Sequence, residues 1–152
     1  MKQVLENFRS GECRVDDVPV PAVSVGCVLV RNHYSVISSG TEGGTVKLGK
    51  MGLLGKARAR PEQAMKVIQV ARTQGVMTAY NAAQRSLEMP IVLGYCSAGV
   101  VIEVGPGVSD YKVGDRVACA GAGFANHAEV VCIPTNLCVL VADSVDLKFA
   151  AC

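Results

Sequence analysis

Hydrophobic and polar residues alternate along the first forty positions of the chain, which is typical of β-strands. Three Val-rich segments carry this pattern, at residues 2–7, 12–21 and 26–38. Gly11 and Gly26 mark the turns between them, because glycine accepts the backbone angles that tight turns need. The sequence therefore predicts three strands at the start of the chain.

A helical period replaces the alternation in the middle of the chain. At residues 58–75, Pro61 suits the first turn of a helix and Gly75 marks its end. The predicted apolar face of this helix consists of Ala64, Val67, Ile68 and Ala71. A second helix is predicted at 77–90, where Pro90 ends it.

The strand pattern returns after the second helix. Further strands are predicted at 91–105, 115–121, 126–134 and 137–142. The simplest fold is mainly β with some α, a β-barrel or curled sheet interrupted by one helical insertion at 43–90. Residues 143–152 resemble the start of another helix, with Asp143 or Ser144 as its cap.

Composition places the chain among globular proteins. Its 152 residues, half of them hydrophobic, are enough for one domain with a real core. The seven cysteines are odd in number and include no closely spaced pair, which favours free thiols and a cytoplasmic protein. No signal peptide and no apolar run of membrane length occurs, so the sequence indicates neither export nor membrane binding.

Charge is unevenly distributed along the chain. The net charge is +2, but residues 43–90 carry +6 and the remainder carries −4. Scattered Lys and Arg usually form a solvated face. The alternative is a lid or docking surface for an anionic substrate such as a nucleotide sugar. Nucleic acid is not expected as a partner, because Tyr80 is the only aromatic residue in this segment.

Three stretches, "SSGTE", "LGYCSAGVVIEVGPGVSDYKVGDRV" and "ANHAEVVCIP", resemble the N-terminal, GroES-like domain of the medium-chain dehydrogenase/reductase superfamily, the alcohol dehydrogenase group. The resemblance implies a GroES-like, partly open barrel over residues 1–152. It also implies an oxidoreductase that transfers hydride between a substrate and NAD or NADP. In that family a Rossmann domain binds most of the cofactor, and residues 143–152 match the start of the connection to it.

Zinc is not expected, although many members of the family bind it. The resemblance places Ser39 where zinc-dependent members have a Cys ligand, and Tyr95 and Cys96 where they have a His–Glu pair. Ser and Tyr hydroxyls are poor zinc ligands. Only "AGAGFA" stands where the family's four structural cysteines would lie. The sequence therefore indicates a zinc-independent branch with no metal.

The resemblance places several candidate site residues at the catalytic cleft. Tyr95 can donate a proton to a developing alkoxide, or it can be a wall residue that shapes the cleft. Ser39 and Thr41 can relay a proton, with Thr41 near the nicotinamide. Alternatively, they form a turn that caps the insertion, with Glu42 in its first turn.

Substrate contacts are expected from a small set of side chains at the same cleft. These are Ser39, Glu42, Cys96 and His127. By itself Cys96 is more typical of a small buried apolar residue, and His127 of an ordinary satisfied histidine.

The helical insertion is similar to that of longer fusions of two oxidoreductases that act on sugars or nucleotide sugars. The expected partners are a small-molecule substrate, a Rossmann domain in the same or another chain, and a second copy in a homo-oligomer. A function of another class remains open, namely a non-catalytic binding or assembly module that retains the barrel.

Overall fold

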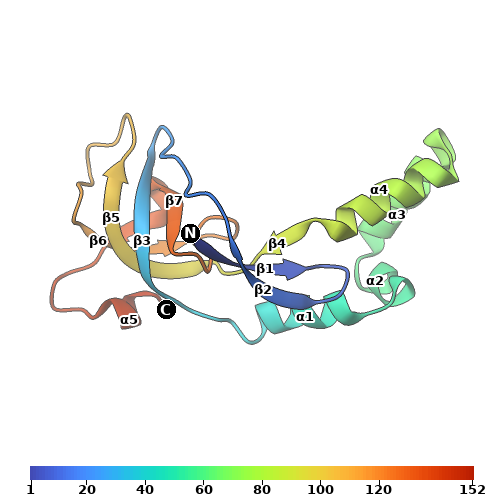
Figure 1. The fold of residues 1–152 in the computed structure, drawn as a ribbon, viewed down its shortest axis with the longest axis horizontal. Coiled ribbons are helices and arrows are strands. Elements are labelled where there is room, and N and C mark those ends of the chain that lie inside the picture. The colour runs from blue at the N-terminus through green and yellow to red at the C-terminus, as the bar shows by residue number, and fades with distance from the viewer. The chain divides into compact units, whose positions relative to one another are not determined.

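A computed structural model gives the backbone of residues 1–152 (Figure 1). It describes all side chains except those of Leu53, Leu54, Gln63, Ser86, Leu87 and Glu88. The chain divides into two compact units. The sheet unit comprises Met1–Val4, Val15–Ser38 and Val92–Cys152, and the helical unit comprises Leu5–Arg14 and Ser39–Ile91.

The sheet unit is built around an antiparallel five-stranded sheet with strand order β7-β3-β5-β6-β8. The strands are β3 (Cys27–Ser35), β5 (Cys96–Val104), β6 (Arg116–Ala120), β7 (Val130–Pro134) and β8 (Cys138–Leu140). The two longest strands, β3 and β5, lie side by side and curve together (Figure 1). Within the described backbone, hydrogen bonds do not join β7 to β8, so the expected GroES-like barrel is partly open.

The core of this unit forms because side chains along each strand point alternately to the two faces of the sheet. Val28 and Val30 in β3 are fully buried, and Val101, Val117 and Ile133 from three neighbouring strands meet them. Val side chains suit this position because their branched Cβ packs well on a pleated surface. The strands predicted at 115–121, 126–134 and 137–142 are therefore confirmed as β6, β7 and β8, which share this core with β3 and β5.

One predicted strand proves to be two. The apolar run at 91–105 divides into β4 (Pro90–Val92) and β5, which belong to different sheets. Gly94 lies between them with φ of 97°, a left-handed angle that glycine adopts readily and that ends the extended strand. Sequence periodicity missed this break because both sides of it are apolar.

The predicted cap of the last helix is also corrected. Helix α5 (Leu147–Ala150) begins after Asp146, whose carboxylate accepts a hydrogen bond from the Lys148 amide at 2.9 Å. Asp143 instead forms an exposed ion pair with Arg116, with 3.8 Å between the Nη1 and Oδ1 atoms. Thus neither Asp143 nor Ser144 caps the helix.

A second, three-stranded sheet has strand order β2-β1-β4, with β1 at Lys2–Asn7 and β2 at Glu12–Asp17. The helices are α1 (Thr41–Lys50), α2 (Leu53–Ala59), α3 (Pro61–Gln74) and α4 (Val76–Glu88). The helices predicted at 58–75 and 77–90 are confirmed as α3 and α4. Pro61 occupies the first turn of α3, and Gly75, with φ of 94°, ends it.

The predicted apolar face of α3 is only partly buried. Val67 and Ile68 are 39% and 45% exposed, whereas Ala64 and Ala71 are half-buried. The sequence predicted a helical insertion from residue 43 but no separate helix at 41–50, because the three glycines of α1 lower helix propensity. None of the described helices is both long enough and apolar enough to span a bilayer.

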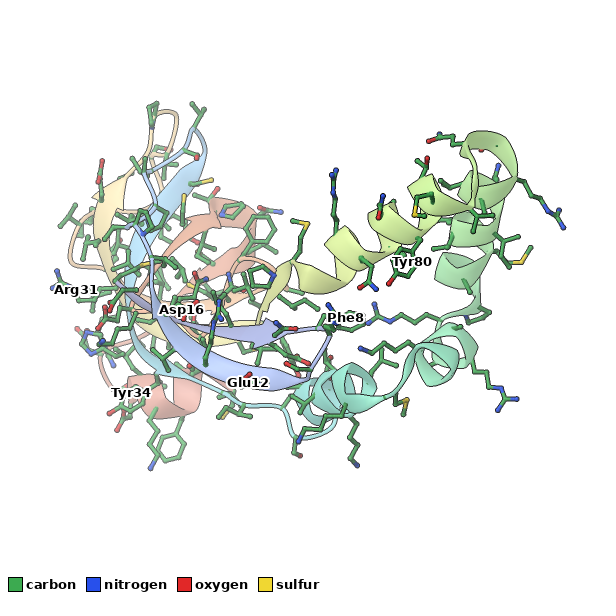
Figure 2. All side chains as sticks on the ribbon, turned by 45° about the vertical axis from the view of Figure 1, so that its right-hand side comes forward. Phe8, Glu12, Asp16, Arg31, Tyr34 and Tyr80 are labelled. Atoms are coloured by element: carbon green, nitrogen blue, oxygen red, sulfur yellow. The ribbon has the colours of Figure 1, made fainter. Side chains whose placement is uncertain are left out.

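Lys56 holds the turn between β1 and β2 within the helical unit. Its ammonium donates hydrogen bonds to the carbonyl oxygens of Phe8 and Arg9, at 2.9 and 3.0 Å. The Lys56 ammonium also lies 5.2 Å from the centroid of the Phe8 ring, and the Arg60 guanidinium lies 5.0 Å from the same centroid (Phe8 is labelled in Figure 2). A buried cation thus has two carbonyl acceptors and an aromatic face, which offset part of its desolvation.

Candidate functional site

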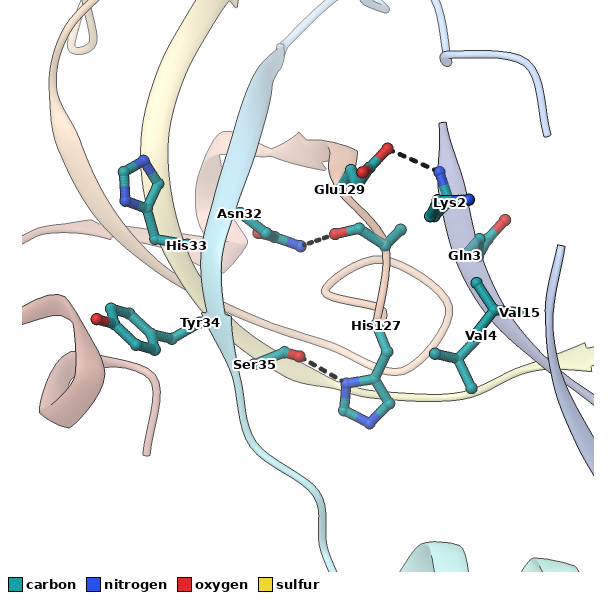
Figure 3. A pocket seen from close by; sticks show the side chains of 11 residues that line it. Lys2, Gln3, Val4, Val15, Asn32, His33, Tyr34, Ser35, His127 and Glu129 are labelled. Carbon is teal, nitrogen blue, oxygen red and sulfur yellow. Dashed lines mark hydrogen bonds between the residues drawn. The ribbon is translucent and has the colours of Figure 1, made fainter. Parts of the chain in front are cut away.

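A pocket of about 290 Å³ opens in the sheet unit between β1, β3 and the segment at residues 126–129 (Figure 3). Its polar lining comes mainly from Lys2, Asn32, Ser35, His127 and Glu129. Asn32 and Ser35 point from β3 toward the 126–129 segment, and His33 and Tyr34 lie on the other side of the β3 ribbon (Figure 3).

Ser35 and His127 form the central polar contact of this pocket. The Ser35 hydroxyl and the His127 Nδ1 atom lie 2.8 Å apart, although the residues are 92 positions apart in sequence. Which atom donates depends on the histidine tautomer. The pair can pass a proton between a ring nitrogen and a hydroxyl, and it fixes the orientation of the His127 ring.

Main-chain hydrogen bonds hold His127 in place. Its amide donates to the Leu93 carbonyl at 2.9 Å, and its carbonyl accepts from the Val4 amide at 2.8 Å. Gly94 lies directly against it, because a Cβ atom added at Gly94 would meet the His127 amide nitrogen at 2.6 Å. The structure therefore brings His127 beside the backbone that leads into Tyr95.

The Asn32 side chain secures the same segment from β3. Its Nδ2 donates to the carbonyls of Asn126 and Ala128, at 3.2 and 2.9 Å, on either side of His127. Glu129 completes the attachment, since its carboxylate accepts from the Lys2 amide at 2.8 Å. A rigid segment of this kind can present His127 in one orientation.

Tyr95 and Cys96 lie at the start of β5 and are half-buried. The Tyr95 carbonyl accepts from the Gly121 amide at 2.8 Å, and the Cys96 carbonyl accepts from the Val36 amide at 3.1 Å. Cys96 also pairs with Ala120 in the sheet. Both predicted residues thus have fixed backbones in the same unit as His127.

Ser39, Thr41 and Glu42 belong to the helical unit. Ser39 is exposed, and Thr41 begins α1, where its carbonyl accepts from the Thr45 hydroxyl at 3.1 Å. Glu42 lies in the first turn of α1, as predicted, and is only 8% exposed. Ser39 and Gly40 form a turn directly before α1, and Gly40 occupies the N-cap position, where it can make no side-chain hydrogen bond.

Sequence reasoning missed Ser35 and Asn32. Both lie on a strand whose alternation indicates only a sheet, and their partners are more than 90 residues away. His127 was named from the sequence, but nothing in the local pattern indicated its hydroxyl partner.

The positions where the resemblance expects zinc ligands hold mostly side chains that are poor zinc ligands. Among the described residues, no group of three or more His, Cys, Asp and Glu side chains is placed to hold a metal. The residues at the expected ligand positions are Ser39, Tyr95 and Cys96, which offer one thiol and two hydroxyls. Zinc in proteins takes thiolate, imidazole or carboxylate ligands instead.

Comparisons with known proteins identify the domain. The model of the alcohol dehydrogenase GroES-like domain matches residues 60–143, more than half of the chain. The chain is 38% identical over 60 residues to a 2-haloacrylate reductase from Burkholderia sp., a match that covers 40% of this chain and 18% of that protein. It is 62% identical over 32 residues to a probable D-xylulose reductase A from Arthroderma otae, covering 21% of this chain and 9% of the relative.

A solved structure supports the same fold. The quinone oxidoreductase of Escherichia coli in complex with NADPH superimposes on 99% of this chain with a TM-score of 0.64 and 17% identity, and the chain covers 36% of that structure. The chain thus spans well under half the length of the proteins it matches. The family match, which covers more than half of the chain, leads to one assignment: the chain belongs to the alcohol dehydrogenase GroES-like domain family.

Proposed function

We propose that this chain is the substrate-side domain of an NAD(P)-dependent oxidoreductase of the alcohol dehydrogenase type that works without catalytic or structural zinc. The observation that carries the proposal is the Gly94–Cys96 segment inside a matched family domain. Its backbone is held by hydrogen bonds from the Gly121 and Val36 amides and by the close approach of His127 to Gly94, and Tyr95 stands where zinc-dependent relatives are expected to have a ligand.

Carbonyl reduction adds a hydride to carbon and a proton to oxygen. The nicotinamide supplies the hydride when the cofactor is bound. Tyr95 donates its phenolic proton to the developing alkoxide and regains a proton from solvent, so it replaces the stabilisation that zinc would provide. Ser39 and Thr41 serve as hydroxyl contacts, with Thr41 toward the nicotinamide.

Substrate binding is assigned to four side chains, Ser39, Glu42, Cys96 and His127. Ser35 orients the His127 ring through its 2.8 Å contact, so that the imidazole presents one polar edge to a substrate oxygen. A sugar or nucleotide sugar is the substrate class we favour. The +6 charge of residues 43–90 would attract a phosphorylated substrate, and the matched relatives include a reductase named for D-xylulose.

The complete protein that contains this chain provides the test. NADH and NADPH oxidation should be measured with keto sugars, quinones and haloacrylates, before and after treatment with a chelator, and the zinc content determined on the same sample. We expect turnover that survives the chelator in a protein with far less than one equivalent of zinc. A full equivalent of zinc, with activity lost to the chelator, would refute the zinc-independent mechanism. Absence of turnover with every substrate would favour the non-catalytic binding module.

A further inference from the structure

Two buried cysteines face each other across neighbouring strands of the sheet unit. Cys119 in β6 and Cys138 in β8 are directly opposite in the antiparallel register. Their Sγ atoms lie 3.7 Å apart, and the residues are 4% and 7% exposed. The proposed oxidoreductase activity uses neither thiol.

The antiparallel register of Cys119 and Cys138 is compatible with a disulfide. Directly opposed residues of an antiparallel pair have Cα atoms about 4.5–5.5 Å apart, which lies within the range of about 4.4–6.8 Å found in disulfides. The sulfur atoms need to approach by roughly 1.7 Å to reach bonding distance, and rotation about χ1 supplies a movement of this size. β8 is a three-residue edge strand that pairs only with β6 in this sheet, so it can also adjust.

We propose that Cys119 and Cys138 form a reversible disulfide when the protein meets a peroxide, making this pair an oxidation site of the domain. Hydrogen peroxide is small enough to reach a thiol that is only slightly exposed. This inference does not depend on the proposed hydride transfer.

The chemistry balances in two steps. The Cys138 thiolate attacks one peroxide oxygen, the O–O bond breaks, and Cys138 becomes a sulfenic acid as hydroxide leaves. The Cys119 sulfur then attacks the Cys138 sulfur, the S–O bond breaks, and the departing hydroxide takes up the Cys119 proton as water. In total, two thiols and one peroxide give one disulfide and two waters.

The order of the two steps follows from the hydrogen bond between the thiols. The hydrogen bond between the two thiols lowers the pKa of Cys138, and the same bond, together with burial, raises the pKa of Cys119. Cys138 is therefore the thiol that reacts as a thiolate, and Cys119 is the resolving partner.

Four other thiols could be oxidised by peroxide in place of Cys119 and Cys138. Cys27 and Cys132 are half-buried, and both line a second pocket of the sheet unit. The exposed thiols of Cys13 and Cys152 are the most accessible to reagents. A test must therefore identify which pair is joined.

The native protein should be treated with dilute hydrogen peroxide, its free thiols blocked, and the unreduced chain digested with trypsin and a Glu-specific protease. Cleavage after Arg116, Glu129 and Lys148 places Cys119 on one peptide and both Cys132 and Cys138 on another. We expect these two peptides to be linked, with a mass lower by two hydrogen atoms, and to separate on reduction.

The Cys132→Ser variant resolves the assignment, because only Cys138 then remains on the second peptide. We expect the link to persist in this variant and to disappear in Cys138→Ala. Oxidised wild-type protein should also melt roughly 5–10 °C higher than reduced protein, because the bond closes a loop in the unfolded chain. The proposal would be overturned if Cys119 and Cys138 remained free thiols after peroxide treatment and were both modified by the blocking reagent. It would also be overturned if the link between the two peptides were lost in Cys132→Ser.

Discussion

Glu6 is a charged residue with no exposed surface. Neither carboxylate oxygen of Glu6 has a hydrogen-bond partner among the described residues. The positive charge of Lys56 attracts the Glu6 carboxylate. Burial raises the pKa of Glu6 above its usual value near 4.5, and the attraction of Lys56 only partly opposes this. The carboxylate is thus a source of instability within the helical unit at neutral pH.

Replacing Glu6 with Gln should stabilise the protein at pH 7 by about 1 kcal/mol, because the amide has a similar shape and no charge to desolvate. The folded state holds the Glu6 proton more tightly than the unfolded state does. The stability that protonated Glu6 contributes to the wild-type protein is therefore fully present below pH 4.5. This contribution is lost as the pH rises through the raised pKa of Glu6. Denaturant unfolding from pH 4 to pH 7 should show the advantage of Glu6→Gln growing with pH.

The exposed Glu12→Gln change in β2 is the matched control, and it should leave stability almost unchanged at every pH. A Glu6→Gln protein that is less stable than wild type at pH 7 would mean that the attraction to Lys56 outweighs desolvation.

Tyr95 is the residue on which the proposed chemistry depends. In the complete enzyme, Tyr95→Phe should lower kcat by about a hundredfold or more while changing KM little, because only the proton donor is removed. Steady-state kinetics would measure this, with the exposed Tyr80→Phe, which does not line the candidate pocket, as a control that should behave as wild type. An unchanged kcat in Tyr95→Phe with a large loss in Ser39→Ala would transfer the proton relay to Ser39 and leave Tyr95 as a wall residue.

At the scale of elements, α1 forms in spite of its glycines because one of them permits close packing. A Cβ atom added at Gly49 would lie 2.7 Å from the Gly11 Cα and 2.9 Å from the Glu6 Oε1. Gly11 itself has φ of 67°, so the turn after β1 needs its own glycine. Helix and turn can therefore approach each other only where both side chains are absent.

Gly49→Ala should destabilise the protein by about 1–3 kcal/mol, since backbone atoms of Gly11 must move to admit the methyl group. Gly44→Ala in the same helix has nothing within 4 Å of the added Cβ and should stabilise by about 0.5–1 kcal/mol through helix propensity. Thermal or denaturant unfolding of both variants would compare them. Equal stabilisation by the two changes would show that the contact at Gly49 relaxes without cost.

At the scale of the whole molecule, the chain matches one family domain and covers only part of its relatives. The glycines at 121–126 resemble a dinucleotide fingerprint, but the backbone that follows them enters β7 at Val130 rather than a helix. A pyrophosphate is usually bound where such a loop opens a helix N-terminus. This sheet unit therefore lacks that arrangement within its described residues.

Residues 1–152 alone should show no binding of NADH or NADPH in the micromolar range, for the same reason. Calorimetric titration of the purified chain would measure it, with the complete protein as the positive control. Micromolar binding by the short chain would show that these residues hold the cofactor without a Rossmann domain.

The sequence by itself determined most of the strands, the helices α3 and α4, and the family of this protein. Alternation of Val residues in β3 and β5, and Pro61 and Gly75 at the ends of α3, are local signals set by side-chain period and backbone angles. Tyr95, Cys96 and His127 could be named as candidate site residues because they lie within contiguous sequence motifs of the family.

Only the tertiary structure decided what these residues contact. The Ser35–His127 pair, the Cys119–Cys138 pair and the packing of Gly49 on Gly11 each join residues far apart in sequence. Strand register and packing create these contacts, whereas periodicity reports only which face of an element is apolar. The break at Gly94 was hidden for a similar reason, because the apolar residues on its two sides look alike in sequence but pair in different sheets.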